Sequence, residues 1–267
     1  MIYTLTIHPA IDIYSSFENF EIGKINRPDN QLFVAGGKGI NVSKILHHLN
    51  VVSKPLVIVG GFTGDYLLKS IDYLSPVAFK EEKNTRICYK ISSLEETAIN
   101  PKPEKLGNVK EDVALFLKKL KEEDILIVSG SGIKEDYQYL LNGVKAKLVL
   151  DVDGKVLKDL SIPKVWIVKP NNEELALVDE NIECAYQKLL KFSDFILHTQ
   201  GHEGATLVTK EERIYVEAFG FDLKTTVGCG DAFLAGFIKG MLDNIPLTDA
   251  LNEASKMAYL AGKMEIK

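Results

Sequence analysis

The feature that most constrains this chain is a regular alternation of short β-prone runs and amphipathic helical segments from about residue 109 onwards. Such alternation is typical of a mostly parallel sheet with helices on both faces, whose ligands bind at the carboxyl ends of the strands. We therefore predict an α/β fold built as a single domain over residues 1–267. The strands expected here are Ile125–Val128, Lys147–Asp151, Val165–Val168 and Phe195–His198, followed by a hairpin of Ala205–Val208 and Arg213–Val216.

Two segments of the N-terminal half interrupt this alternation. A first strand is expected at Ile2–Ile7, and residues 12–33 then show a partial two-residue alternation of apolar side chains. A second group of β-prone runs lies within residues 77–100. We expect both segments to form strands outside the main sheet, as a small β flap. The chain is expected to end in two helices, Asp231–Leu242 and Leu247–Met264.

Composition narrows the range of partners and compartments. The chain is 46% hydrophobic and 26% charged, and its net charge of −5 offers no general attraction to nucleic acid or to an anionic membrane. No apolar stretch approaches the ~20 residues that span a bilayer, and the N-terminus lacks the basic start of a signal peptide. The three cysteines are an odd number without close spacing, which favours a reducing compartment. We expect a cytoplasmic protein with small-molecule partners, without a nucleic-acid or membrane partner.

The strongest local signal is Gly228-Cys229-Gly230-Asp231, which leads directly into a predicted helix. Two glycines around a small residue allow a sharp turn whose N–H groups point into one pocket, and the start of a helix adds a positive dipole end. This combination suits a phosphoryl group in transfer. Asp231 could accept a proton from an attacking hydroxyl, although an aspartate in this position could also serve only to stabilise the helix N-terminus.

A second glycine-rich segment, Gly36-Gly37-Lys38-Gly39-Ile40-Asn41, precedes another amphipathic helix. The glycines allow close approach of the backbone to a ligand, Lys38 adds a mobile cation, and Asn41 can both donate and accept hydrogen bonds. The spacing does not fit the phosphate-binding G-x-x-x-x-G-K-[ST] loop, and no G-x-G-x-x-G occurs in a strand–turn–helix setting. Taken alone, the segment could also be a tight turn without function.

Together the two segments resemble the two signatures of the PfkB (ribokinase-like) carbohydrate kinases. Between them, Lys169-Pro170-Asn171-Asn172-Glu173-Glu174-Leu175 is similar to the family's KPN-x-E-E-L segment, and Gln200-Gly201-His202-Glu203-Gly204-Ala205 to its nucleotide-binding loop. Four motifs in the family's order are far more specific than one. The resemblance implies a ribokinase-like fold with a small β lid over a sugar site, and ATP-dependent phosphorylation of a sugar hydroxyl.

Within the family, the closest resemblance is to 1-phosphofructokinases and tagatose-6-phosphate kinases. It is carried by His8–Asp12, Gly23–Arg27, Thr85-Arg86 and Thr97–Pro101. This implies an acceptor sugar that already carries a phosphate. His8 departs from the asparagine expected in the family, and the sequence stops soon after Met264, where relatives continue with elements that help to form the adenine pocket.

The resemblance also implies a role for each motif residue. The catalytic set would be Asp231, Gly228, Cys229 and Gly230. Substrate would be bound by Asp12, Arg27, Gly37, Lys38, Asn41 and Arg86, with Arg27, Lys38 and Arg86 as a clamp for the sugar phosphate. ATP would lie against Lys169, Thr199, Gly201 and Gly204, while Asn171 and Glu174 would bind Mg²⁺ through water.

Further expectations are a monovalent cation site and a homodimer that forms through the lid, because exposed sheet edges favour pairing. Two alternatives stay open. One is a kinase for an unphosphorylated sugar or a nucleoside. The other, from a different class, is a non-catalytic protein that senses ligands with a kinase fold.

Overall fold

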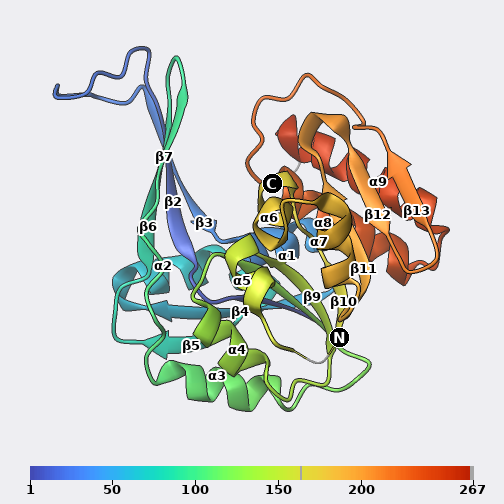
Figure 1. Ribbon diagram of the computed structural model, residues 1–267. Helices are drawn as coiled ribbons and strands as arrows, with labels where there is room; N and C mark the ends of the chain where they lie inside the picture. Colours follow the sequence, from blue (N-terminus) through green and yellow to red (C-terminus); the bar gives the residue numbers. More distant parts are fainter. Residues whose placement is uncertain (163, 265–267) are drawn as a thin grey trace.

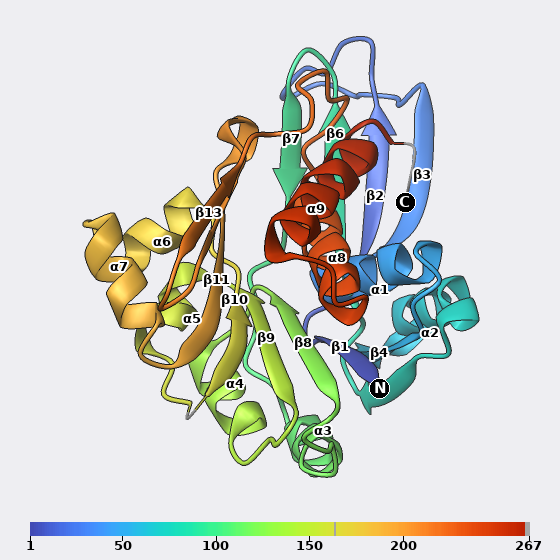
Figure 2. The same cartoon turned by 90° about the vertical axis from the view of Figure 1, so that its right-hand side faces the viewer.

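The computed structural model describes residues 1–162 and 164–264, and these form two sheets of unequal size (Figures 1 and 2). Within the described residues, the larger sheet has nine strands in the order β13-β12-β11-β10-β9-β8-β1-β4-β5. All neighbouring strands from β11 to β5 run parallel, while β12 and β13 form an antiparallel hairpin at one edge. The strands are β1 (Ile2–Thr6), β4 (Ser53–Gly60), β5 (Val77–Glu81), β8 (Ile125–Gly130), β9 (Lys147–Val152), β10 (Val165–Val168), β11 (Ser193–Thr199), β12 (Ala205–Val208) and β13 (Arg213–Val216).

Helices cover both faces of this sheet, as predicted. Successive residues of the central strands alternate between two cores: Leu126 and Leu148 pack with one, Ile127 and Val149 with the other. Because both faces are covered, the strands are almost continuously apolar. The first core is shared with α3 (Val109–Leu117), α4 (Lys134–Leu141), α5 (Gly154–Asp159), α6 (Asn172–Val178) and α7 (Ile182–Leu189); the second with α1 (Lys38–His48), α8 (Cys229–Leu242) and α9 (Leu247–Gly262).

The smaller sheet rises from the body of the molecule as a twisted arm (Figure 1). In the part of the chain that the structure describes, this sheet has four strands in the order β3-β2-β6-β7. Ile11 and Ile13 of β2 are buried in a third core together with residues of α2 (Gly61–Ser70), so α2 supports the base of the arm. The strands are β2 (Ala10–Ser16), β3 (Asn30–Gly36), β6 (Arg86–Ser92) and β7 (Glu96–Ile99).

Some predicted boundaries are wrong. The second flap segment was expected to begin at residue 77, but β5 (Val77–Glu81) pairs in parallel with β4 and belongs to the larger sheet, so this part of the flap begins at Arg86. Periodicity identifies a strand but not the sheet it joins. At the C-terminal side, α8 already begins at Cys229 and α9 already ends at Gly262. Within the described residues, no helix is both long and apolar enough to cross a membrane.

Candidate active site

A pocket of about 610 Å³ lies where the carboxyl ends of the parallel strands meet the smaller sheet and the start of α8. Its lining includes Thr6 at the end of β1, Ser129 near the end of β8, Asp151 in β9, Lys169 just after β10 and Thr199 at the end of β11. The predicted position of the ligand site, at the carboxyl ends of the strands, therefore coincides with this pocket.

The turn before α8 places a buried carboxylate in this pocket. Gly228 adopts a left-handed conformation (φ 86°) as the N-cap of α8, which favours glycine, and Asp231 follows in the first turn. The Asp231 side chain is buried, and Asn41 Nδ2 donates a hydrogen bond of 2.8 Å to its Oδ2 atom. Burial, together with the nearby charge of Asp151, raises the pKa of Asp231 to about 6. Such a carboxylate is poised to exchange a proton near neutral pH.

Two lysines lie beside a second buried carboxylate, that of Asp151. Asp151 Oδ1 is 3.0 Å from Lys169 Nζ and 3.4 Å from Lys38 Nζ, and Lys38 Nζ is also 3.9 Å from Glu174 Oε1. Although burial disfavours the charged carboxylate, Lys169 and Lys38 together hold the pKa of Asp151 below its ordinary value. In return Asp151 raises the pKa of Lys38, so Lys38 remains charged in the pocket.

The predicted metal-binding pair caps α6. Asn171 Oδ1 accepts a hydrogen bond from the Glu174 amide (2.7 Å), and Glu174 Oε2 accepts one from the Asn171 amide (3.0 Å). This reciprocal capping box fixes both side chains next to Thr199, with which Asn171 forms a parallel bridge. Burial raises the pKa of Glu174.

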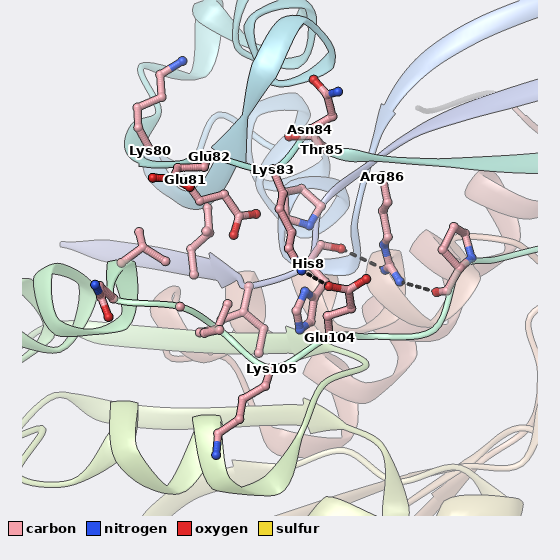
Figure 3. Close-up of a pocket in the computed structure, with 18 of the residues that line it drawn as sticks. His8, Lys80, Glu81, Glu82, Lys83, Asn84, Thr85, Arg86, Glu104 and Lys105 are labelled. Carbon is pink, nitrogen blue, oxygen red and sulfur yellow. Dashed lines mark hydrogen bonds and ion pairs between the residues drawn. The ribbon is translucent and has the colours of Figure 1, made fainter.

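The smaller sheet contributes the opposite wall of the pocket. Asp12 of β2 and Cys88 of β6 lie at paired positions, and the Cys88 thiol forms a hydrogen bond with the Asp12 carboxylate. Arg86 donates to the backbone oxygens of His8 (2.8 Å) and Pro101 (3.1 Å) (Figure 3). A Cβ atom on Gly36 would lie 2.0 Å from Asp12 Oδ2, so a glycine is needed there to leave room for this carboxylate.

Unsatisfied polar groups concentrate in this pocket. Among the described residues, five buried side-chain polar atoms have no hydrogen-bond partner, and all five belong to residues that line it. Buried polar groups are normally paired, so their concentration in one place indicates a site that a polar ligand completes. The atoms are Thr6 Oγ1, His8 Nε2, Arg86 Nε, Ser129 Oγ and Asp151 Oδ2.

Several predicted site residues lie together in the lining, namely Asp12, Gly37, Lys38, Asn41, Arg86, Lys169, Asn171, Glu174, Thr199, Gly228, Gly230 and Asp231. Arg27 does not: it is exposed in the loop between β2 and β3 and does not line the pocket. Cys229 directs its sulfur to the Thr225 oxygen at 3.6 Å, and neither it nor Gly201 and Gly204, in the turn after β11, is part of the lining.

Other residues of the pocket lining were not predicted from the sequence as site residues. Asp151 was placed at the end of a predicted strand without a role, although an acidic residue at the end of a buried strand is a usable signal. Asn100 lies in the segment Thr97–Pro101 that carries the family resemblance, but no role was predicted for it. Lys90 and Lys102 lie outside every motif, so only the folded chain brings them to the pocket.

Comparison with known proteins supports this geometry. Residues 5–262 match the family described as pfkB family carbohydrate kinase. The chain is 33% identical to a 1-phosphofructokinase of Bacillus subtilis, over 94% of this chain and 88% of the relative. It shares the fold of phosphofructokinase-2 from Escherichia coli in complex with fructose-6-phosphate (TM-score 0.89, 22% identity, 99% and 94% coverage) and of a ribokinase from Thermotoga maritima (TM-score 0.78, 18% identity, 98% and 92% coverage). The chain therefore belongs to the pfkB family of carbohydrate kinases and has the ribokinase-like fold that its motifs predicted.

Proposed function

We propose that this kinase transfers the γ-phosphoryl group of ATP to a hydroxyl of a sugar phosphate, with fructose 1-phosphate converted to fructose 1,6-bisphosphate as the type reaction. The observation that carries the proposal is the buried Asp231 carboxylate, held by Asn41 at the N-terminus of α8. The relative named 1-phosphofructokinase and the fructose-6-phosphate complex of the Escherichia coli enzyme support a phosphorylated acceptor.

In the proposed reaction, Asp231 Oδ accepts the proton of the acceptor hydroxyl. The hydroxyl oxygen forms a bond to the γ-phosphorus while the bond from that phosphorus to the β,γ-bridging oxygen breaks, and ADP leaves with the electron pair. The amides around Gly228 and Gly230, together with the dipole of α8, stabilise the negative charge of the phosphoryl group in transfer. Lys38 and Lys169 lie on the same side of the pocket and add positive charge there.

Family membership implies ATP and a divalent cation, and we propose Mg²⁺ bound through water by Asn171 and Glu174. The donors fit this cation, because Mg²⁺ prefers oxygen ligands, keeps several waters and uses few carboxylates beside substrate phosphates. When bound, Mg²⁺ neutralises charge on the phosphates of ATP. Thr199, Gly201 and Gly204 would bind ATP, and a potassium complex of the Escherichia coli enzyme supports a monovalent cation as well.

We further propose that the smaller sheet acts as a lid and as the contact of a homodimer. Apolar side chains on its two edge strands are exposed, among them Leu32 and Phe33 on β3 and Ile99 on β7. Exposed strand edges with apolar side chains favour pairing with a second copy. Such pairing would also give the exposed Arg27 a surface to contact. ATP as the phosphoryl donor of the proposed reaction supports a cytoplasmic location of this kinase.

A panel of phosphosugars and free sugars, assayed with MgATP, tests the proposal. We expect turnover with at least one phosphosugar, and a rate lower by about 10²-fold or more for Asp231→Asn, as is typical when a general base is lost. Asp243→Asn is the matched control, because Asp243 follows the same helix but pairs with Lys239 at the surface, and it should retain the wild-type rate. Turnover of free sugars or nucleosides alone would favour the alternative kinase. Nucleotide binding without any turnover would favour the sensor.

A further inference from the structure

The cations that line the pocket fall into two groups with different partners. Lys38 and Lys169 are both paired with Asp151. Arg86, Lys90 and Lys102 also line the pocket, but in the part of the chain that the structure describes none of these three forms an ion pair with a carboxylate. One side of the pocket thus carries positive charge that the protein itself does not neutralise by pairing.

Strand β6 positions two of these three cations. Arg86, Cys88 and Lys90 alternate along the strand and therefore point to the same face, because side chains in a strand repeat every two residues. In the parallel register with β2, Cys88 lies opposite Asp12. The charges of Lys90 and Arg86 are accordingly the two strongest that act on Asp12, whereas Lys38 and Lys169 are the cations that act on Asp231. The unpaired cations therefore belong to the Asp12 side of the pocket.

The segment from Asn100 to Lys102 brings the third cation to the same place. Asn100 Oδ1 accepts a hydrogen bond of 2.9 Å from Lys90 Nζ, and the Pro101 oxygen accepts one of 3.1 Å from Arg86 Nη1. Two consecutive residues thus bind the ends of Lys90 and Arg86, and Lys102 follows directly. Arg86 and Lys102 also line an adjoining cavity of about 920 Å³, the one drawn in Figure 3, so they lie at the junction of both hollows.

We propose that Lys90 and Lys102, together with Arg86, bind the phosphate that the acceptor sugar already carries. This inference rests on the proposed function. It keeps Arg86 of the expected clamp and assigns Lys90 and Lys102 in place of Arg27 and Lys38. A phosphate dianion between three cations gains charge-assisted hydrogen bonds, and Arg86 Nε is a buried donor that still lacks an acceptor. An unphosphorylated sugar would leave these cations unsatisfied, so the group discriminates between the two substrate classes. Asp12 lies near Lys90 and Arg86, and Asp231 lies near Lys38 and Lys169, so each carboxylate is near a different group of cations.

Kinetics of Lys90→Met and Lys102→Ala, singly and combined, test the proposal. For the phosphosugar that wild type accepts best, we expect KM to rise by about 10- to 100-fold per lost charge-assisted contact, with kcat changed by less than about 3-fold. The kcat/KM for the corresponding free sugar should stay within about 2-fold of wild type, because no phosphate contact is lost. Lys105→Ala is the matched control, since Lys105 lines only the adjoining cavity and should leave both substrates unaffected.

Inorganic phosphate serves as a second probe, as an inhibitor that competes with the phosphosugar. Its inhibition constant should rise in the same variants, and thermal melting checks that each variant is folded. Lys102 is an exposed position. Suppose that wild type uses the phosphosugar, and that both Lys102→Ala and Lys90→Met keep the wild-type KM for it. The assignment of these lysines is then wrong, while the proposed function stands. If wild type neither phosphorylates nor binds any phosphosugar in calorimetry, both are wrong. An equal loss for phosphorylated and free sugars would also overturn the inference, because it would indicate a structural role.

Discussion

At the scale of single residues, the environment of Asp231 predicts how activity depends on pH. The carboxylate must be ionised to accept a proton, and its pKa of about 6 means that this form is lost as the pH falls through that value. We expect kcat/KM to be constant above pH 7 and to decline below pH 6. The amide of Asn41 stabilises the ionised form, so Asn41→Ala should move the inflection to higher pH. The pH–rate profiles of wild type and Asn41→Ala measure this shift. An inflection near pH 4 that is the same in both proteins would contradict the role of Asp231 as the base.

A chain of hydrogen bonds from Tyr186 in α7 through the buried His198 to the first residue of α6 gives a second prediction at this scale. Tyr186 Oη donates to His198 Nδ1 at 2.7 Å, and His198 Nε2 donates to Asn172 Oδ1 at 2.7 Å. Burial lowers the pKa of His198 and thus favours the neutral ring. Tyr186→Phe leaves the Nδ1 acceptor without a partner, which should cost about 1–3 kcal/mol in the free energy of unfolding. Urea denaturation at pH 7 measures the change.

The exposed Tyr66 provides the control. Within the described residues, its hydroxyl forms no hydrogen bond with a buried group, so Tyr66→Phe should stay within about 0.5 kcal/mol of wild type. The sign of the pH dependence follows from the same histidine. Its folded-state pKa lies below the ordinary value of 6.5, so the unfolded chain binds more protons below that pH. The contribution of His198 to stability is therefore complete above pH 6.5 and decreases as the pH falls below it.

At the scale of elements, the contact between α5 and α6 positions the proposed metal-binding motif. Gly154 opens α5, and a Cβ atom there would lie 2.4 Å from the Glu174 oxygen and 2.7 Å from its Cα. Because these are backbone atoms, Gly154→Ala can be accommodated only by moving the two helices apart. We expect a loss of about 1–3 kcal/mol in unfolding free energy and a higher KM for MgATP. Gly107→Ala, where nothing lies within 4 Å, is the control, and equal KM values for both variants would argue against a role for Glu174.

At the scale of the whole molecule, the arm formed by the smaller sheet predicts the oligomeric state. Its strand β2 is buried against α2, while the edge strands β3 and β7 expose apolar side chains. We expect a dimer by light scattering, and a monomer when Leu32 and Phe33 are both replaced by glutamate, because charges oppose edge-to-edge pairing. Phe62→Glu, which changes an even more exposed side chain on α2, should leave the dimer intact. A wild-type monomer at micromolar concentration would contradict the proposed lid contact.

Much of this architecture was predictable because local sequence patterns specify its strands, helices and turns. The alternation of strands and helices indicated a parallel sheet covered on both faces, and periodicity placed β8, β9 and β10 within a few residues of their observed bounds. The turn at Gly228 was equally readable, since the left-handed conformation favours glycine and a following aspartate suits the first turn of a helix. By itself, then, the amino-acid sequence determined the class of fold, the family motifs and the side of the sheet on which ligands bind.

The tertiary structure alone decided which distant segments meet. Strand register brings Asp12, Cys88 and Lys90 to one face of the smaller sheet. The chain then turns so that Asn100, ten positions after Lys90, forms a hydrogen bond with it. The tertiary structure also joins β5 to the larger sheet and leaves Arg27 outside the pocket. The physical reason is that a local pattern specifies only the conformation of its own segment. The convergence of charges depends on sheet pairing and on packing between segments that are far apart along the chain.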